Sequence, residues 1–201
     1  MLKNMALARV LLFVIATAVA VPTAPLGGSK TIVRDVLDST QTIPKCAAAT
    51  SSCAFAINNV AYMKYTNKPG FIDQSPDTIT MAFDVTNNAN GIQTACSFSN
   101  GIFMGQWTDA GTKWFPCGDR SLVDENGSKY MVKTTAQFHW DAWKMAVNQT
   151  WICSNDAADK RSNIAARADV AMAPVCKDSA TESYTLKECS APDMTTPASV
   201  V

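Results

Sequence analysis

The sequence predicts an all-β domain: a disulfide-stapled β-barrel or β-sandwich of about eight short antiparallel strands. Short segments alternate apolar with polar residues between positions 53 and 190, and turn signals rich in Gly, Asn and Pro separate them. Seven cysteines accompany this pattern. No segment reads as a long, capped amphipathic helix, which favours strands throughout.

The first twenty residues predict a cleaved secretory signal peptide. Lys3 and Arg9 supply positive charge ahead of the apolar run Val10–Ala20. That run ends in Ala18-Val19-Ala20, a small-residue cleavage site. A membrane-spanning helix needs roughly 20 apolar residues, and this run is shorter. We therefore expect passage through the endoplasmic reticulum, an extracellular protein and no membrane span.

Three further segments follow the signal peptide. Residues 21–52 predict a flexible leader or propeptide, because prolines and glycines interrupt them and no period is sustained. Residues 53–190 predict the β-domain. Residues 191–201 predict a disordered tail, because they combine prolines with small polar residues.

The first half of the domain predicts three strands. The first runs through residues 55–63 and ends at the turn signal Asn67-Lys68-Pro69-Gly70. Residues 79–85 alternate apolar with polar side chains, which is typical of a half-buried strand. Residues 92–98 continue this alternation after a turn over residues 87–91.

The second half predicts four strands. Residues 131–138 read as a strand, and the alternate residues of 145–153 place an apolar face opposite the wettable Asn148. Residues 164–172 alternate in the same way, and Tyr184 with Leu186 indicates a last short strand.

The cysteines predict disulfides, because oxidised pairs are typical of small secreted domains. We expect two pairs that bracket turn-rich excursions and a third that ties the domain's ends: Cys96–Cys117, Cys153–Cys176 and Cys53–Cys189. Connectivity does not follow uniquely from sequence, so this pairing is a hypothesis. Cys46 is left over, and it is either free, capped, lost with the leader, or bonded to a second chain in a dimer.

Several function classes lack their signatures. Zero net charge without a basic block argues against nucleic-acid binding. The chain has one His and no C-x-x-C pair, so we expect no metal site. It has no G-x-G-x-x-G, P-loop or G-x-S-x-G motif, so neither a cofactor nor a serine hydrolase triad is expected. Whether the chain is an enzyme is left open.

Two N-glycosylation sequons agree with secretion. They are Asn126-Gly127-Ser128 and Asn148-Gln149-Thr150, and we expect glycans on Asn126 and Asn148.

An aromatic cluster at Phe138-His139-Trp140-Asp141-Ala142-Trp143 allows two interpretations. It is either barrel core or the wall of an apolar ligand pocket. In the pocket interpretation the ligand-binding residues are Phe138, Trp140, Trp143 and Trp107. The hydrogen-bonding groups, which are also the candidate catalytic residues, are His139, Tyr130 and Asp141.

A family resemblance rests on three segments. They are Phe55-Ala56-Ile57, the Cys96–Cys117 segment with Trp107 inside it, and Val147–Cys153. Together with the signal peptide, these features resemble the Alternaria major-allergen-like family of small secreted fungal proteins. The resemblance implies a compact β-barrel or sandwich, effector or elicitor action at plant surfaces, and binding of small aromatic ligands by some members.

Two functions follow as hypotheses. The first is a secreted, effector-like or elicitor-like binding protein whose partner is a small apolar or aromatic ligand or a host surface protein. The second is a cofactor-free enzyme of natural-product assembly, a cyclase or pericyclase such as a hetero-Diels–Alderase. It would act on a polyketide or terpenoid by proximity and a few hydrogen bonds.

Overall fold

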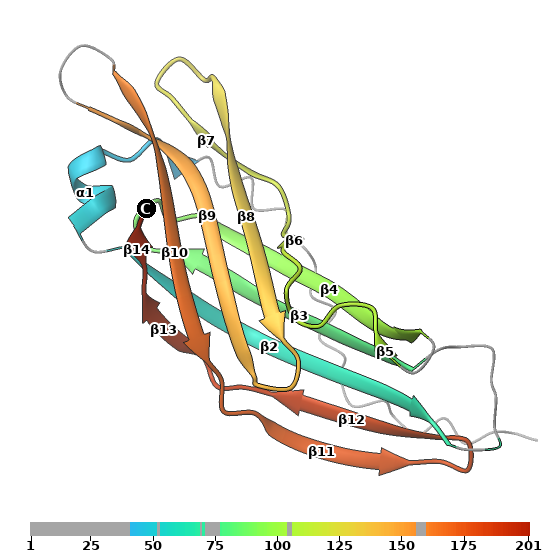
Figure 1. Cartoon of the computed structure of the whole chain (residues 1–201). Coiled ribbons are helices and arrows are strands. Elements are labelled where there is room, and N and C mark those ends of the chain that lie inside the picture. Colours follow the sequence, from blue (N-terminus) through green and yellow to red (C-terminus); the bar gives the residue numbers. More distant parts are fainter. Residues whose placement is uncertain (1–40, 52, 69, 71–76, 104–105, 156–159) are drawn as a thin grey trace, which may run out of the picture. The chain divides into compact units, whose positions relative to one another are not determined.

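The computed structural model describes residues 41–51, 53–68, 70, 77–103, 106–155 and 160–201 (Figure 1). The chain divides into the segment Met1–Asp38 and the unit Ser39–Val201. The predicted signal peptide, and the leader up to residue 40, lie outside the described residues. The described unit is nearly all β and carries disulfides, which confirms the predicted fold class.

The described strands form two sheets, here called sheet 1 and sheet 2. In order across sheet 1 these strands are β11 (Val175–Ala180), β12 (Tyr184–Ser190), β2 (Ala54–Asn67), β3 (Thr78–Asn87), β4 (Gln93–Phe103) and β5 (Gln106–Trp107), with β13 (Met194–Pro197) also on β2. In order across sheet 2 they are β1 (Gln41–Thr42), β7 (Arg120–Val123), β8 (Lys129–His139), β9 (Lys144–Ser154), β10 (Arg161–Ala171) and β14 (Ser199–Val200), with β6 (Phe115–Pro116) also on β8.

Alternation along the strands builds the core between the two sheets. On β3 the buried residues are Ile79, Met81, Phe83 and Val85. On β9 they are Met145, Ala146, Val147, Gln149, Trp151 and Cys153. Apart from Ala146, which shares the outer face of sheet 2 with Asn148, these residues lie on the inward faces that the period of two predicts, and Gln149 is the one polar member among them.

A β-bulge in β2 fixes which of its later side chains face inward. The pairing of β2 with β3 shifts between Asn58 and Ala61, and Asn59 lies in the left-handed region with φ 55°. Ile57 before the bulge and Val60 after it are both buried, so the inward parity changes there. From Val60 on, the inward positions are the even-numbered ones, which include Lys64.

Both predicted ends of the domain need correction. The predicted flexible leader contains β1 and the helix α1 (Cys46–Ser51) in its described part. The predicted disordered tail contains β13 and β14, which pair with β2 and β10 respectively. These strands are too short to show alternation, and pairing with distant strands orders them.

Cysteine pairing follows the folded topology. The described cysteines form three disulfides: Cys46–Cys153, Cys96–Cys117 and Cys176–Cys189. The predicted Cys96–Cys117 bridge is therefore present. Cys46 is not left over but bonded to Cys153, which corrects the expectation that it lies outside the disulfide set; of its four open alternatives, a bridge to a second chain would need a thiol that is already bonded.

The predicted bridges Cys153–Cys176 and Cys53–Cys189 are wrong. Cys189 lies directly opposite Cys176 in the β11–β12 ladder, and the two are bonded. Cys53 is buried and free, and burial raises the pKa of its thiol. Sequence spacing suggested a Cys153–Cys176 bridge across a short excursion. The chain between these two cysteines instead forms the long strand β10, which separates them.

The structure adds a strand that the sequence did not predict. All six residues of β11 are exposed, so the segment shows no alternation. It forms the free edge of sheet 1 in the described part of the chain, beyond β12. Among the described residues, no helix is long and apolar enough to cross a membrane.

Candidate functional site

The predicted aromatic cluster packs largely into the core. Phe138 is fully buried and Trp140 is 5% exposed, with their ring centroids 5.3 Å apart. The Trp140 ring also meets Phe98 edge-on at 5.9 Å, and its Nε1 donates to Asp109 Oδ2 at 3.2 Å. A ligand between Phe138 and Trp140 would require these rings to separate. Their packing corresponds to the core interpretation of the cluster.

Trp143 is the half-buried member of the cluster. Its ring lies 5.7 Å from that of Phe138 and 4.8 Å from that of Tyr62 on β2. Burial, together with the negative charge of Asp141, raises the pKa of Tyr62 to about 12. The Tyr62 phenol is therefore protonated at neutral pH.

The predicted hydrogen-bonding groups are not all brought together. Tyr130 and His139 lie at opposite ends of β8. They are nine positions apart in the strand, which is about 30 Å at the rise of a strand. The expectation that one pocket holds Tyr130, His139 and Asp141 is therefore wrong for Tyr130. His139 and Asp141 are exposed beside the β8–β9 turn.

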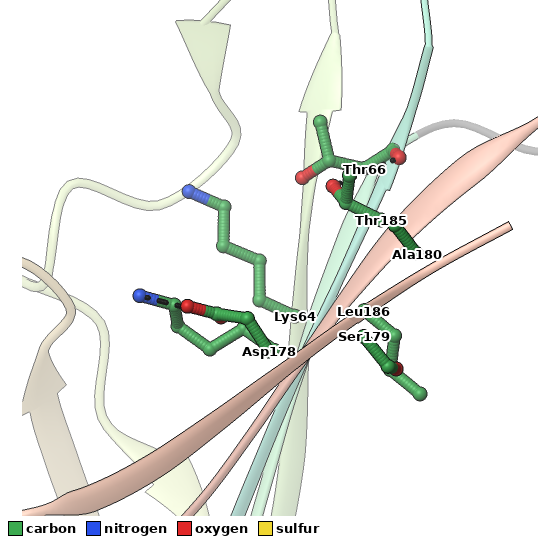
Figure 2. A pocket seen from close by; sticks show the side chains of 8 residues that line it. Lys64, Thr66, Asp178, Ser179, Ala180, Thr185 and Leu186 are labelled. Carbon is green, nitrogen blue, oxygen red and sulfur yellow. Dashed lines mark hydrogen bonds and ion pairs between the residues drawn. The ribbon is translucent and has the colours of Figure 1, made fainter.

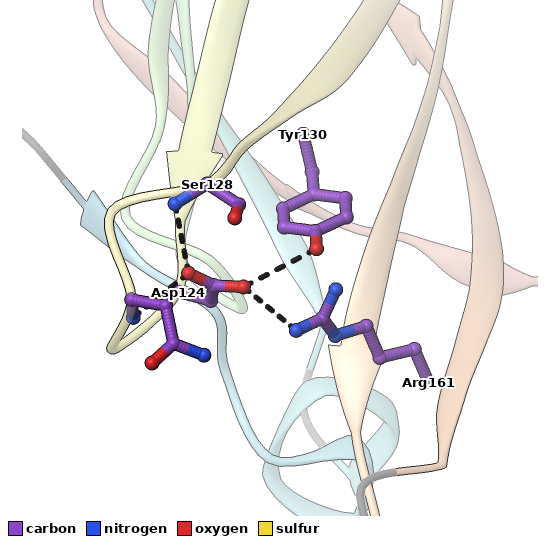
Figure 3. A network of polar contacts seen from close by, with 5 residues as sticks. Asp124, Ser128, Tyr130 and Arg161 are labelled. Carbon is purple, nitrogen blue, oxygen red and sulfur yellow. Dashed lines mark hydrogen bonds and ion pairs between the residues drawn. The ribbon is translucent and has the colours of Figure 1, made fainter.

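Tyr130 belongs instead to a polar network at the β7–β8 turn (Figure 3). Its hydroxyl donates to Asp124 Oδ2 at 3.2 Å, and Arg161 Nη2 donates to the same oxygen at 2.7 Å. The Arg161 guanidinium also lies over the Tyr130 ring, 4.4 Å from its centroid. Backbone amides, first that of Ser128, and Arg161 hold the pKa of Asp124 below its usual range.

A polar pocket of about 440 Å³ opens on sheet 1 (Figure 2). Residues of strands β2, β11 and β12 line it: Lys64, Thr66, Asp178, Ser179, Ala180, Thr185, Leu186 and Lys187. Between β2 and β12, Thr66 pairs with Thr185 and Lys64 pairs with Lys187. Between β11 and β12, Asp178 pairs with Lys187. One face of three adjacent strands therefore presents these polar side chains together. We call this site the Lys64 pocket.

Positive groups outnumber negative groups in the Lys64 pocket. Lys187 Nζ lies 3.6 Å from Asp178 Oδ1, which pairs those two charges. Lys64 Nζ lies over the Trp107 ring, 5.3 Å from its centroid. Figure 2 shows the Lys64 and Asp178 side chains extending to the same side of the ribbon. Two ammonium groups against one carboxylate leave a site suited to an anion.

Sequence reasoning named Trp107 as a ligand contact but missed its lysine neighbour. Lys64 carries no motif, and its inward direction depends on the bulge at Asn59. Its partner positions on β12 depend on a strand pairing more than a hundred residues away. The sequence signal for this site was the spacing of two between Lys64 and Thr66, which places both side chains on one face of a strand.

A second, more apolar hollow of about 660 Å³ lies on sheet 1 around Ala61, Met63, Ala82 and Val175. Met63 is 44% and Val175 is 73% exposed. Lys177 and other polar side chains border it. We call it the outer groove.

The described residues contain no group of three His, Cys, Asp or Glu side chains placed to hold a metal ion. Comparison with protein-family models, with curated proteins and with solved structures found no match to this chain. The resemblance to the Alternaria major-allergen-like family therefore stays a prediction.

Proposed function

We propose that this protein is an extracellular, non-catalytic binding protein that takes a small organic anion with a planar apolar body in the Lys64 pocket. The observation that carries the proposal is the half-buried Lys64, whose ammonium lies over the Trp107 ring beside an open pocket of about 440 Å³. This volume lies within the range of roughly 300–1,000 Å³ of small-molecule sites.

The chemistry of the pocket supports this class of ligand. Lys64 and Lys187 supply ammonium donors, and Thr66 and Thr185 supply hydroxyl groups on the same side of the sheet. A carboxylate or sulfonate accepts charge-assisted hydrogen bonds from such donors. Ala180 and Leu186 supply the apolar part of the lining, against which a planar ring packs.

The extracellular part of the proposal rests on the signal-like N-terminus and on three disulfides among the described residues. Cross-links of this number are typical of small secreted domains. An effector or elicitor role at a plant surface belongs to the same proposal, with the ligand as its recognised molecule.

The test is a fluorescence titration with 8-anilinonaphthalene-1-sulfonate, an aromatic anion of this class. We expect saturable binding to the wild type with quenching of Trp emission. Lys64→Gln removes one charge-assisted hydrogen bond, so we expect about tenfold weaker binding, or about 1.4 kcal/mol.

Lys177→Gln is the matched control, because it makes the same change of charge on the same sheet but beside the outer groove. It should leave the affinity for the probe unchanged. Equal weakening by Lys177→Gln, or no weakening by Lys64→Gln, would place the bound anion elsewhere and overturn the proposal.

A further inference from the structure

The two sequons occupy very different environments in the folded protein. We propose that Asn126 carries an N-linked glycan and that Asn148 does not. This inference is independent of the proposed ligand, because neither sequon contributes to the Lys64 pocket. It changes the expectation, drawn from sequence, that both asparagines are modified.

The first sequon is the tip of the β7–β8 turn. Asp124 Oδ1 accepts hydrogen bonds from the backbone amides of Asn126 at 2.9 Å and Ser128 at 2.8 Å (Figure 3). Its other oxygen is held by Arg161 and Tyr130. The Asp124 carboxylate therefore fixes the backbone of the sequon and leaves its side chains outside the network.

The side chains at this tip face open space. Asn126, Gly127 and Ser128 are all exposed. Gly127 has φ 81°, and an added Cβ there would meet no atom within 4 Å. Among the described residues, no hydrogen bond engages the Asn126 side-chain amide. A branched sugar on Asn126 Nδ2 therefore displaces no protein contact.

The second sequon lies in the middle of sheet 2. Asn148 on β9 pairs with Thr135 on one side and Arg167 on the other, so strands flank it on both sides. Its Oδ1 is buried and has no hydrogen-bond partner in the described structure. Asn148 as a whole is half-buried, and its place between two strands restricts the room around its amide for a sugar.

Neighbouring side chains crowd Asn148 on the outer face of sheet 2. Ala146 shares the outer face of β9 with Asn148 and is only 3% exposed. The Arg167 guanidinium lies over the Trp114 ring, 5.3 Å from its centroid. Arg167 also donates to Asp169 at 3.0 Å. Arg167 and Asp169 are themselves exposed, so the contact that a glycan on Asn148 would have to displace is that of Arg167 with Trp114.

Position also separates the Asn126 glycan from the proposed ligand. In Figure 1 the β7–β8 turn and the β11–β12 hairpin lie at opposite ends of the described unit. A glycan at Asn126 therefore leaves the Lys64 pocket open. It covers the Asp124 network instead.

The experiment expresses the full chain in a eukaryotic secretory host and maps glycopeptides by mass spectrometry, with electrophoresis before and after endoglycosidase treatment. We expect a single occupied sequon, at Asn126. Asn126→Gln and Ser128→Ala should each abolish the mobility shift. Ser128→Ala keeps the backbone amide that donates a hydrogen bond to Asp124, so it removes the sequon without altering the turn.

The matched variants Asn148→Gln and Thr150→Ala should leave the shift unchanged. A glycan found on Asn148, or a shift reduced by either of these variants, overturns the proposal. So does a secreted wild-type protein without sugar on Asn126. Binding of 8-anilinonaphthalene-1-sulfonate by the deglycosylated protein is read separately, so the glycan proposal and the ligand proposal fail independently.

Discussion

Trp143 has a backbone conformation that bulky residues rarely adopt, with φ 51°. It closes the β8–β9 turn, where Met172 N donates to its carbonyl oxygen at 2.8 Å. Its ring packs between Phe138 and Tyr62. The contacts of the ring therefore offset a strained main chain at this residue.

This balance predicts an unusual order of stability for two variants. Trp143→Ala and Trp143→Gly both lose the ring contacts, and Trp143→Ala should lower the free energy of unfolding by about 3 kcal/mol. Trp143→Gly should be the more stable of the two by about 1 kcal/mol, because glycine adopts positive φ without penalty. Guanidinium denaturation with the disulfides intact measures the difference. If alanine is equal to or better than glycine, the strain assigned to Trp143 is absent.

At the scale of elements, a buried polar network joins the two sheets. Gln149 on β9 is fully buried, and its Oε1 accepts from Asn87 Nδ2 at 2.7 Å and Asn90 Nδ2 at 2.8 Å. Its Nε2 donates to Thr134 Oγ1 at 2.9 Å. Gln149 thus links the β3–β4 turn to β8 and β9 through hydrogen bonds that only one register satisfies.

Gln149→Leu should destabilise the protein although it increases apolar burial. It leaves the amides of Asn87 and Asn90 without their acceptor in the core, and each unsatisfied group costs about 1–3 kcal/mol. We expect the free energy of unfolding to fall by about 2–4 kcal/mol in chemical denaturation. Gln93→Leu, at an exposed position of β4, is the control and should change it by less than about 0.5 kcal/mol. A Gln149→Leu variant as stable as wild type would show that the network contributes nothing.

Strands were predictable where the signal was local. The alternation over residues 79–85 places the buried face of β3 correctly, because burial against one layer imposes a period of two. The network around Gln149 was not predictable, because a glutamine in an apolar face has no local partner in the sequence. The Lys64 pocket was missed for the same reason, since its members meet only through the β2–β12 pairing.

At the scale of the whole described unit, segments near its two ends are joined to the sheets by strand pairing and by a disulfide. β13 pairs with β2 in sheet 1, and β14 pairs with β10 in sheet 2. At the other end, Cys46, the first residue of α1, is bonded to Cys153 on β9. Composition alone predicted both ends to be flexible. The prediction failed because pairing with a distant strand leaves no pattern in the sequence of a short segment. The ends are ordered by long-range contacts.

The Cys46–Cys153 bridge should therefore contribute more to stability than the Cys176–Cys189 bridge. The first closes a sequence separation of 107 residues and the second only 13. On the chain-entropy model, loops of these sizes correspond to about 4.7 and about 3 kcal/mol. We expect the double variant Cys46→Ala/Cys153→Ala to lose about 1–2 kcal/mol more than Cys176→Ala/Cys189→Ala, by guanidinium denaturation under non-reducing conditions.

Cys53→Ala is the control for this comparison, because it removes a buried thiol without opening a loop. Its cost should be smaller than that of either double variant. The Cys46–Cys153 variant should also speed amide hydrogen exchange in α1, since the bridge joins this helix to β9. Suppose instead that the Cys176–Cys189 variant is the less stable of the two and that exchange in α1 is unchanged. The N-terminal segment would then be held by its hydrogen bonds to β7 and β9, and the long-range disulfide would add little to the fold.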